Sequence, residues 1–284
     1  MIDIRVEGLV KSFDLEKKIL DGLTFQVDTG ERVGLLGRNG AGKTTLFKIL
    51  TGELDYDSGT VQIASGRRVG LISQIPVYPE GYTVEDVLRT AFARMFRMKD
   101  EMDALALAME QGASDDATLR RYGELNARFE GLGGWDTDTA VNKVANGLSI
   151  SDEMRTRIFD CLSGGEKTRV NLGRLILEDT DVLLLDEPTN HLDYGNQLRA
   201  LSMVRALVKR GFGVIMTSHN PDHVLLLGGQ VGILGNDGRF LVGNAEEVMT
   251  EERLRALYRS DLYLTYVERV GRKVCIPGRL KSDE

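Results

Sequence analysis

Gly37-Arg38-Asn39-Gly40-Ala41-Gly42-Lys43-Thr44 is the stretch that decides the fold of this 284-residue chain. It fits G-x-x-x-x-G-K-[ST], in which glycines let successive backbone N–H groups point at phosphate oxygens. The apolar run Val33–Leu36 before it predicts a buried strand, and Lys43–Leu50 after it has helical spacing. The start of that helix adds its positive dipole end. A chance glycine-rich turn is the alternative, but both flanks that a phosphate-binding loop (P-loop) requires are present.

The P-loop residues have separate expected tasks. Lys43 would reach the β and γ phosphates of a nucleotide, and Thr44 would be a ligand of Mg²⁺. This motif alone does not distinguish a kinase, a GTPase and an ATPase. The predicted nucleotide-binding residues here are Gly37, Asn39, Gly40, Ala41, Gly42, Lys43, Thr44 and Thr45.

Asp186 and Glu187 come directly after the apolar run Val182–Leu185. A buried parallel strand ends at the carboxyl edge of its sheet, where ligands bind in open α/β folds. We therefore expect Asp186 to hold Mg²⁺ through water and Glu187 to polarise an attacking water. A positioned general base contributes about 10²–10⁴ in rate. The alternative is a pair of solvated carboxylates, but a P-loop in the same chain favours the metal site.

A second anion-binding helix start is predicted at Leu162-Ser163-Gly164-Gly165-Glu166. One triphosphate does not need two such cradles on one subunit. We therefore expect a dimer in which this turn covers the γ-phosphate held by the partner's P-loop. A serine-capped helix with flexible glycines is the alternative interpretation.

The rest of the chain predicts an α/β fold. Helical spacing runs from Val84 to Phe129, with a turn near 112–117. The later segments alternate as crossover units of a parallel sheet do. They are a strand at Val182–Leu185, a helix at Gln197–Lys209, a strand at Val214–Ser218, a hairpin of Gln230–Leu234 with Arg239–Val242, a helix at Glu246–Arg259 and a strand pair within Leu262–Ile276.

Composition limits the function classes. The formal net charge of −7 argues against a broad nucleic-acid-binding face, although not against a local basic patch. Cys161 and Cys275 lie far apart and without a CxxC pattern, which indicates structural thiols. The N-terminus lacks the apolar core of a signal peptide, and no run reaches the roughly 18 apolar residues of a membrane span. We expect a cytoplasmic protein, or one peripheral to the inner membrane if it is coupled to transport.

Together, the P-loop, LSGGE at 162–166, DEPTNHLD at 186–193 and His219 resemble the ATP-binding cassette (ABC) ATPase superfamily. The resemblance implies ATP and Mg²⁺ as ligands and a RecA-like, mostly parallel core sheet with an antiparallel β subdomain and an α-helical subdomain. It implies one domain over 1–284: a core of 1–80 and 160–245, a helical subdomain with an arm-like insertion at 81–159, and a C-terminal extension at 246–284. A nucleotide kinase would leave LSGGE and His219 without a task.

The same resemblance suggests further site residues. Gln74 matches a catalytic glutamine that contacts Mg²⁺ and water, and His219 matches the switch histidine at the γ-phosphate. Phe13 matches the aromatic residue that stacks on adenine. Asp193 matches the D-loop that links two sites. The nucleotide-covering turn of the signature comprises Ser163, Gly164, Gly165 and Glu166.

Two parts of the chain resemble two different ABC subfamilies. Up to about Asp193 the chain is similar to the first cassette of ABC-F proteins, which act on the ribosome; Lys43 and Ser163 lie 120 positions apart, leaving room for an arm. From Leu192 onward it is similar to ATPase subunits of iron–siderophore importers. This pattern predicts a recombined or engineered cassette joined near the D-loop.

Partners follow from these resemblances. A lone cassette must pair with a second copy to complete its sites. The ABC-F likeness predicts a ribosome or RNA partner, the importer likeness a membrane permease, and the join a cassette with basal ATPase activity only. A basic helix side could touch RNA, although a solvated helix face is the alternative; it comprises Arg89, Arg94, Arg97 and Lys99.

Overall fold

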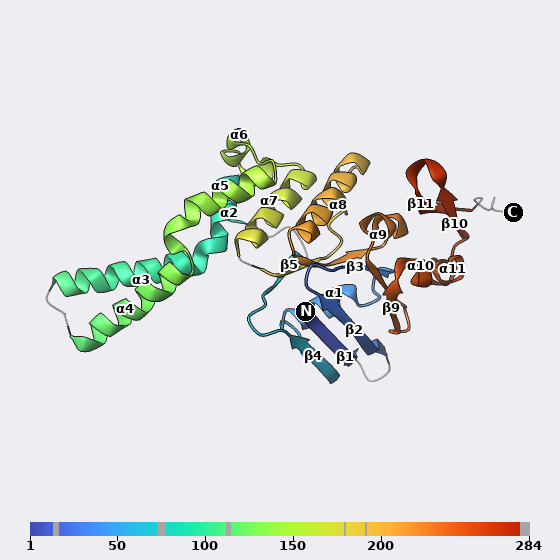
Figure 1. Cartoon of the computed structure of the whole chain (residues 1–284), viewed down its shortest axis with the longest axis horizontal. Helices are drawn as coiled ribbons and strands as arrows, with labels where there is room; N and C mark the ends of the chain where they lie inside the picture. Colours follow the sequence, from blue (N-terminus) through green and yellow to red (C-terminus); the bar gives the residue numbers. More distant parts are fainter. Residues whose placement is uncertain (14–16, 73–77, 112–114, 179, 191, 279–284) are drawn as a thin grey trace. The chain divides into compact units, whose positions relative to one another are not determined.

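The structure is a computed structural model that describes residues 1–13, 17–72, 78–111, 115–178, 180–190 and 192–278 (Figure 1). The chain divides into two compact units, one formed by 1–75 with 180–284 and the other by 76–179. Gln74 lies outside the described residues, so its predicted role rests on sequence alone.

The first unit holds the described strands and five helices. Its strands are β1 (Ile2–Ser12), β2 (Lys18–Asp28), β3 (Arg32–Gly37), β4 (Ser58–Ile63), β5 (Val69–Ile72), β6 (Val182–Leu185), β7 (Gly213–Ser218), β8 (Gln230–Leu234), β9 (Phe240–Asn244), β10 (Leu262–Val267) and β11 (Arg272–Pro277). Its helices, in the described part, are α1 (Lys43–Leu50), α8 (Tyr194–Lys209), α9 (Pro221–Leu227), α10 (Ala245–Val248) and α11 (Glu251–Tyr258).

The main sheet of this unit confirms the predicted α/β class. Within the described residues its strand order is β5-β6-β7-β3-β8-β9, and every neighbouring pair is parallel except β8 with β9. A smaller antiparallel sheet has the order β2-β1-β4, and β10 pairs with β11. Because parallel strands end at one edge, the segments that follow β3, β6 and β7 are brought together there.

Helix α1 packs into the core that joins the two larger sheets. Leu46 and Phe47 on this helix are buried in the same apolar cluster as Val6 of β1 and Leu184 of β6. Strands β6 and β7 are buried at every position, which explains the unbroken apolar sequence of β6 and the apolar run Val214–Met216 in β7. Burial on both sides fixes α1 and therefore the loop that leads into it.

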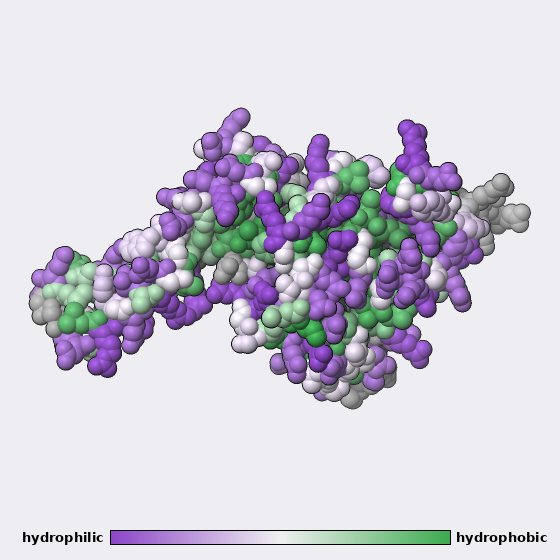
Figure 2. Space-filling view, in the orientation of Figure 1, coloured by the Kyte–Doolittle hydropathy of each residue, from purple (hydrophilic) through white to green (hydrophobic). Residues whose placement is uncertain are grey.

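The second unit is helical. In its described residues it contains α2 (Val84–Arg89), α3 (Ala93–Glu110), α4 (Asp116–Gly131), α5 (Thr137–Gly147), α6 (Asp152–Arg155) and α7 (Gly164–Leu177). Helices α3 and α4 form a hairpin, called the arm below, whose facing sides bury Met98, Met102, Leu125 and Phe129 (Figure 1). Hydrophilic side chains cover much of its visible surface (Figure 2).

Two expectations from the sequence were wrong in detail. The helix expected over Glu246–Arg259 is two helices, because Thr250 caps α11 by accepting a hydrogen bond from Arg253 N at 3.3 Å. The helix expected to begin at Gln197 begins at Tyr194, because Asp193 Oδ1 caps it by accepting from Asn196 N at 2.8 Å. Local capping decided both boundaries.

Candidate active site

The P-loop turns sharply between β3 and α1. Gly40 and Gly42 have φ of 81° and 103°, a region that side chains rarely adopt. A Cβ on Gly42 would lie 2.7 Å from Ile19 Cγ2, so only glycine fits there. Gly42 is also the N-cap of α1 and gives no side-chain cap. The first N–H groups of the helix therefore face the loop, where an anion binds well.

Lys43 is buried at the base of this loop, with 6% of its surface exposed. Its Nζ donates to Gly37 O at 2.8 Å and to Arg38 O at 3.2 Å. The same Nζ lies 3.1 Å from Glu187 Oε1. An ammonium has three N–H donors, and the two carbonyl oxygens and the Glu187 carboxylate provide one acceptor for each of them. A phosphate that reaches Lys43 must compete with the Glu187 carboxylate.

Thr44 and Asp186 meet beside Lys43. Thr44 Oγ1 donates to Asp186 Oδ2 at 2.6 Å, and Thr217 Oγ1 donates to Asp186 Oδ1 at 2.6 Å. Among the described residues no cluster of three or more His, Cys, Asp or Glu is placed to hold a metal ion. Mg²⁺ is commonly bound by one or two protein oxygens together with phosphates and waters. A hydroxyl and a carboxylate in contact fit that mode of binding.

Glu187 is held in an unusual backbone conformation, with φ of 49°. Its N–H donates to Thr217 Oγ1 at 2.8 Å, and Asn190 Nδ2 donates to its Oε2. His219 Nδ1 lies 3.6 Å from the same Oε2. Strained residues of this kind persist only where their surroundings fix them. Here the conformation of Glu187 is fixed by its contacts with Lys43, Thr217 and Asn190.

The pKa of Glu187 lies below its ordinary value. Burial acts to raise the pKa, but the hydrogen bond and positive charge of Lys43, with Asn190 and His219, outweigh it. The carboxylate is therefore ionised near neutral pH and able to accept a proton.

Phe13 and Asp193 were also predicted to belong to this site. The ring of Phe13 is 64% exposed, with Lys11 Nζ 5.6 Å from its centroid, so one aromatic face is accessible for stacking. Asp193 serves as the cap of α8, and hydrogen bonds from that helix start, led by Asn196 N, lower its pKa.

The predicted signature turn lies in the second unit and forms a capping box. Ser163 Oγ accepts from Glu166 N at 3.4 Å, and Glu166 Oε2 accepts from Ser163 N at 2.8 Å. The bond from Ser163 N, a second bond from Ser163 Oγ to Glu166 Oε2 at 2.8 Å, and the charge and hydrogen bond of Arg157 lower the pKa of Glu166. Gly164 and Gly165 begin α7, so their N–H groups point out of the helix start.

Sequence reasoning missed several residues of this site. Thr217 bonds to both Asp186 and Glu187, and Asn190 bonds to Glu187. Thr217 lies within an apolar strand, so only the pairing of β6 with β7 places its hydroxyl beside the acid pair. The one sequence signal for Thr217 was a hydroxyl residue near the end of the predicted strand that precedes His219.

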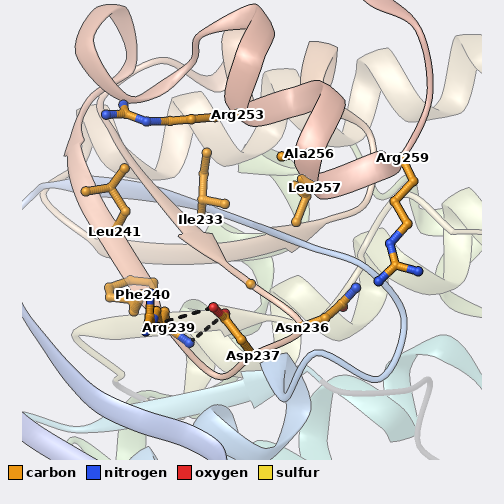
Figure 3. Close-up of a pocket in the computed structure, with 11 residues that line it drawn as sticks. Ile233, Asn236, Asp237, Arg239, Phe240, Leu241, Arg253, Ala256, Leu257 and Arg259 are labelled. Atoms are coloured by element: carbon orange, nitrogen blue, oxygen red, sulfur yellow. Dashed lines mark hydrogen bonds and ion pairs between the residues drawn. The ribbon is translucent and has the colours of Figure 1, made fainter.

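A cavity of about 680 Å³ lies elsewhere in the first unit, between the turn after β8 and helix α11 (Figure 3). Arg253, Arg239 and Arg259 surround an apolar floor there, and Arg239 pairs with Asp237 at 3.6 Å. Arg253 donates to the carbonyl oxygen of residue 247 at 2.6 Å. None of the P-loop or acid-pair residues lines this cavity. The candidate active site is therefore identified by the contacts among Lys43, Thr44, Asp186 and Glu187 and not by this cavity.

A strand, P-loop and helix at the edge of a parallel sheet, with an acid pair on a nearby strand, define a P-loop nucleotide-binding protein. The family model described as ABC transporter matches residues 20–190. The chain therefore belongs to the ABC transporter ATP-binding cassette family, whose members hydrolyse ATP.

Relatives extend over different lengths of the chain. It is 37% identical over 63% of its length to the uncharacterized ABC transporter ATP-binding protein YfmM of Bacillus subtilis, covering 35% of that protein. It is 30% identical over 87% of its length to ABC transporter F family member 5 of Arabidopsis thaliana, covering 37% of that protein. It is 29% identical over 93% of its length to the energy-dependent translational throttle protein EttA of Mycobacterium tuberculosis, covering 43% of that protein.

The chain thus spans 35% to 43% of the length of these curated relatives. Among solved structures, an ABC transporter described as metal-chelate type, in an inward-facing conformation, has a TM-score of 0.76 at 22% identity and covers 98% of both chains. That likeness shows the fold. The comparisons do not show the join predicted near Asp193.

Proposed function

We propose that this chain binds Mg-ATP in its P-loop and hydrolyses it to ADP and phosphate between two paired copies. The observation that carries the proposal is the convergence of Lys43, the Thr44–Asp186 pair and Glu187 at one edge of the parallel sheet. The reaction needs groups that bind the phosphates, the metal ion and the attacking water. Lys43, the Thr44–Asp186 pair and Glu187 provide these three groups in that order.

The roles follow from the contacts. Lys43 and the P-loop N–H groups bind the phosphates, while Thr44 and Asp186 would hold Mg²⁺, which neutralises charge on the phosphates. Glu187 takes a proton from water as the water oxygen attacks the γ-phosphorus, and ADP leaves with the electron pair of the broken bond. His219, whose Nδ1 lies 3.6 Å from Glu187 Oε2, orients that carboxylate and would contact the γ-phosphate. Gln74 would contribute to metal and water binding, a role that rests on the family resemblance alone.

A complete site needs the second copy. The turn at Ser163–Glu166 of the partner protomer would cover the γ-phosphate, because its glycine N–H groups form a second helix start that binds anions. Asp193, at the start of α8, would contact the other site across the same interface. Phe13 would stack on adenine.

Size-exclusion chromatography of Glu187→Gln tests the pairing. This variant retains the phosphate contacts but lacks the base, so a dimer is expected with Mg-ATP and a monomer without it. The control is Lys43→Ala in the same background, which should remain monomeric under both conditions. A monomeric Glu187→Gln protein under saturating Mg-ATP would contradict the shared site.

For the biological role we propose an ABC-F-like ATPase of the cytoplasm that acts on ribosomes. The arm supports it, because α3 and α4 form a long hairpin with exposed Leu107 and Leu119 toward its end. The relatives named for the F family and for translation support it too. Of the four cations predicted to form a basic side, Arg94 and Arg97 lie exposed on α3. Arg89 belongs instead to α2 and pairs with Glu85, and Lys99 pairs with Asp103.

Co-sedimentation with ribosomes tests that role. Glu187→Gln should pellet with ribosomes in the presence of Mg-ATP, and Arg94→Glu with Arg97→Glu should weaken the association. No ATP-dependent association would discard the role but leave the ATPase proposal standing.

An importer subunit is the second candidate. It rests on the likeness of 192–284 to iron–siderophore importer subunits, and a stable complex with a membrane permease in detergent would support it. The structure contains no helix, in its described residues, of the length and apolarity that a membrane crossing requires. A recombined cassette with basal ATPase activity only would show turnover that neither ribosomes nor a permease changes.

A further inference from the structure

His223 is a buried histidine on α9 that the roles above do not use. Only 6% of its surface is exposed. Its Nδ1 lies 3.1 Å from Thr189 Oγ1 and 3.5 Å from Ser218 Oγ, and its Nε2 lies 3.3 Å from Asn220 Nδ2. The ring therefore joins the segment that follows Glu187 to the segment that carries His219.

The neighbouring asparagine fixes the tautomer of this ring. Asn220 Oδ1 accepts a hydrogen bond from Asp222 N at 2.9 Å, so its Nδ2 is the atom that faces His223. An amide nitrogen is a donor, which makes Nε2 of His223 the acceptor. The proton of the neutral ring is then on Nδ1, and Nδ1–H donates to Thr189 Oγ1. Burial, and then the charge of His219, lower the pKa of His223 against the opposing effect of Asp222, which favours this neutral form.

Both ends of this connection lead to the catalytic groups. Thr189 precedes Asn190, whose Nδ2 donates to Glu187 Oε2. On the other side, Ser218 directly precedes His219, and Asn220 N donates to Ser218 Oγ at 3.0 Å. Thr189 is itself 4% exposed, so a hydroxyl left unpaired there would carry the cost of burial.

We propose that His223 is a positioning residue that, through its Nδ1–H bond to Thr189, fixes Glu187 and His219 relative to each other; the proposal rests on the function proposed above. Its ring links two loops that come from different strands, β6 and β7. The strained φ of Glu187 requires such support, because nothing in the local sequence favours that conformation. Loss of the link leaves the phosphate-binding groups in place and displaces the base.

Steady-state kinetics of four variants test the link. His223→Phe keeps the ring volume without the bond, and Thr189→Val removes only the hydroxyl. Both should lower kcat by about tenfold or more while KM for Mg-ATP changes little, since a misplacement of 1 Å costs up to about 10² in rate. His223→Asn and Thr189→Ser retain a donor and an acceptor and should restore most of kcat.

The double variant His223→Phe/Thr189→Val should be no slower than either single variant, because both changes break one bond. Additive losses, a change confined to KM and thermal stability, or a His223→Asn protein as slow as His223→Phe would each overturn the proposal and leave a packing role. Thr189→Val guards against the case in which His223→Phe fails to fold.

A spectroscopic measurement separates this proposal from the proposed function. The chain has three histidines, so its imidazole ¹⁵N resonances are few. We expect a neutral, Nδ1-protonated His223, and Thr189→Val should shift the resonances of His219 as well. Unchanged His219 resonances would overturn the link whether or not the chain hydrolyses ATP, whereas an intact link in an inactive chain would place the failure in the proposed function.

Discussion

At the scale of single residues, Glu187 combines three constraints that are unfavourable alone. Its backbone is in the left-handed region, its carboxylate is largely buried, and it lies 3.1 Å from Lys43 Nζ. The ion pair offsets the cost of burial only while both partners are present. The lysine that is expected to hold phosphate therefore also holds the base in its charged form.

Replacing this carboxylate should separate binding from hydrolysis. Glu187→Gln is expected to lower the rate of phosphate release by about 10²–10⁴, the range for a lost general base. Mg-ATP should bind as tightly as in the wild type or more tightly, because a phosphate no longer competes with a carboxylate for Lys43. Phosphate release and equilibrium nucleotide binding measure the two effects. Glu252→Gln, the same change at an exposed carboxylate of α11, is the control and should change neither.

The same group gives stability a defined dependence on pH. Its folded-state pKa is depressed, so its contribution is present above the ordinary value of 4.5 and lost as pH falls through the folded value. Urea unfolding of the wild type and Glu187→Gln should therefore show a difference in unfolding free energy that shrinks as pH falls below 4.5. A difference that stays constant, or grows toward acid, would mean that Glu187 is not ionised in the folded protein.

Sequence reasoning reached some site residues and not others for a physical reason. Lys43, Asp186 and Glu187 follow periodic segments directly, so local pattern places them at a sheet edge. Thr217 and His223 act through contacts with segments about thirty residues away. Their roles depend on which strands are neighbours, and a single sequence does not encode that order locally.

At the scale of elements, the P-loop helix and the buried strands were the most predictable parts. Helix α1 and strand β6 have the bounds that periodicity predicted, because burial makes every residue of β6 apolar and places the apolar residues of α1 on its buried side. Helix α9 was missed, although Asn220 as cap and Pro221 at the first turn are both helix-start signals. A helix of seven residues offers too short a pattern for periodicity to detect.

Helix α7 gives a test at this scale. Ser163→Ala removes the cap of a 14-residue helix and should lower the free energy of unfolding by about 1 kcal/mol. Glu166→Gln keeps the reciprocal bond to Ser163 N and should cost less. Urea denaturation measures both. A larger loss in Glu166→Gln than in Ser163→Ala would show that the negative charge at the helix start, rather than the capping bond, stabilises α7.

At the scale of the whole molecule, the two halves of the proposed site lie in separate compact units. Lys43 belongs to the unit of 1–75 and 180–284, and Ser163 belongs to the unit of 76–179. Each unit provides a helix start suited to anions, and each is folded around its own core. In a two-fold symmetric pair, the same two surfaces meet twice, which yields two sites of identical composition.

This arrangement predicts complementation between two inactive proteins. Lys43→Ala damages the P-loop and Ser163→Arg damages the signature turn, so each protein alone should hydrolyse almost no ATP. In an equal mixture, a mixed dimer has one intact site, made of the P-loop of one protomer and the signature turn of the other. Random two-fold pairing then restores about a quarter of the wild-type sites, and of the rate if sites act independently. Circular dichroism should first show both variants folded. A mixture no more active than its components would contradict the shared site. It would mean that the P-loop and the signature turn that bind one triphosphate belong to the same protomer, or that the signature turn does not contact the nucleotide.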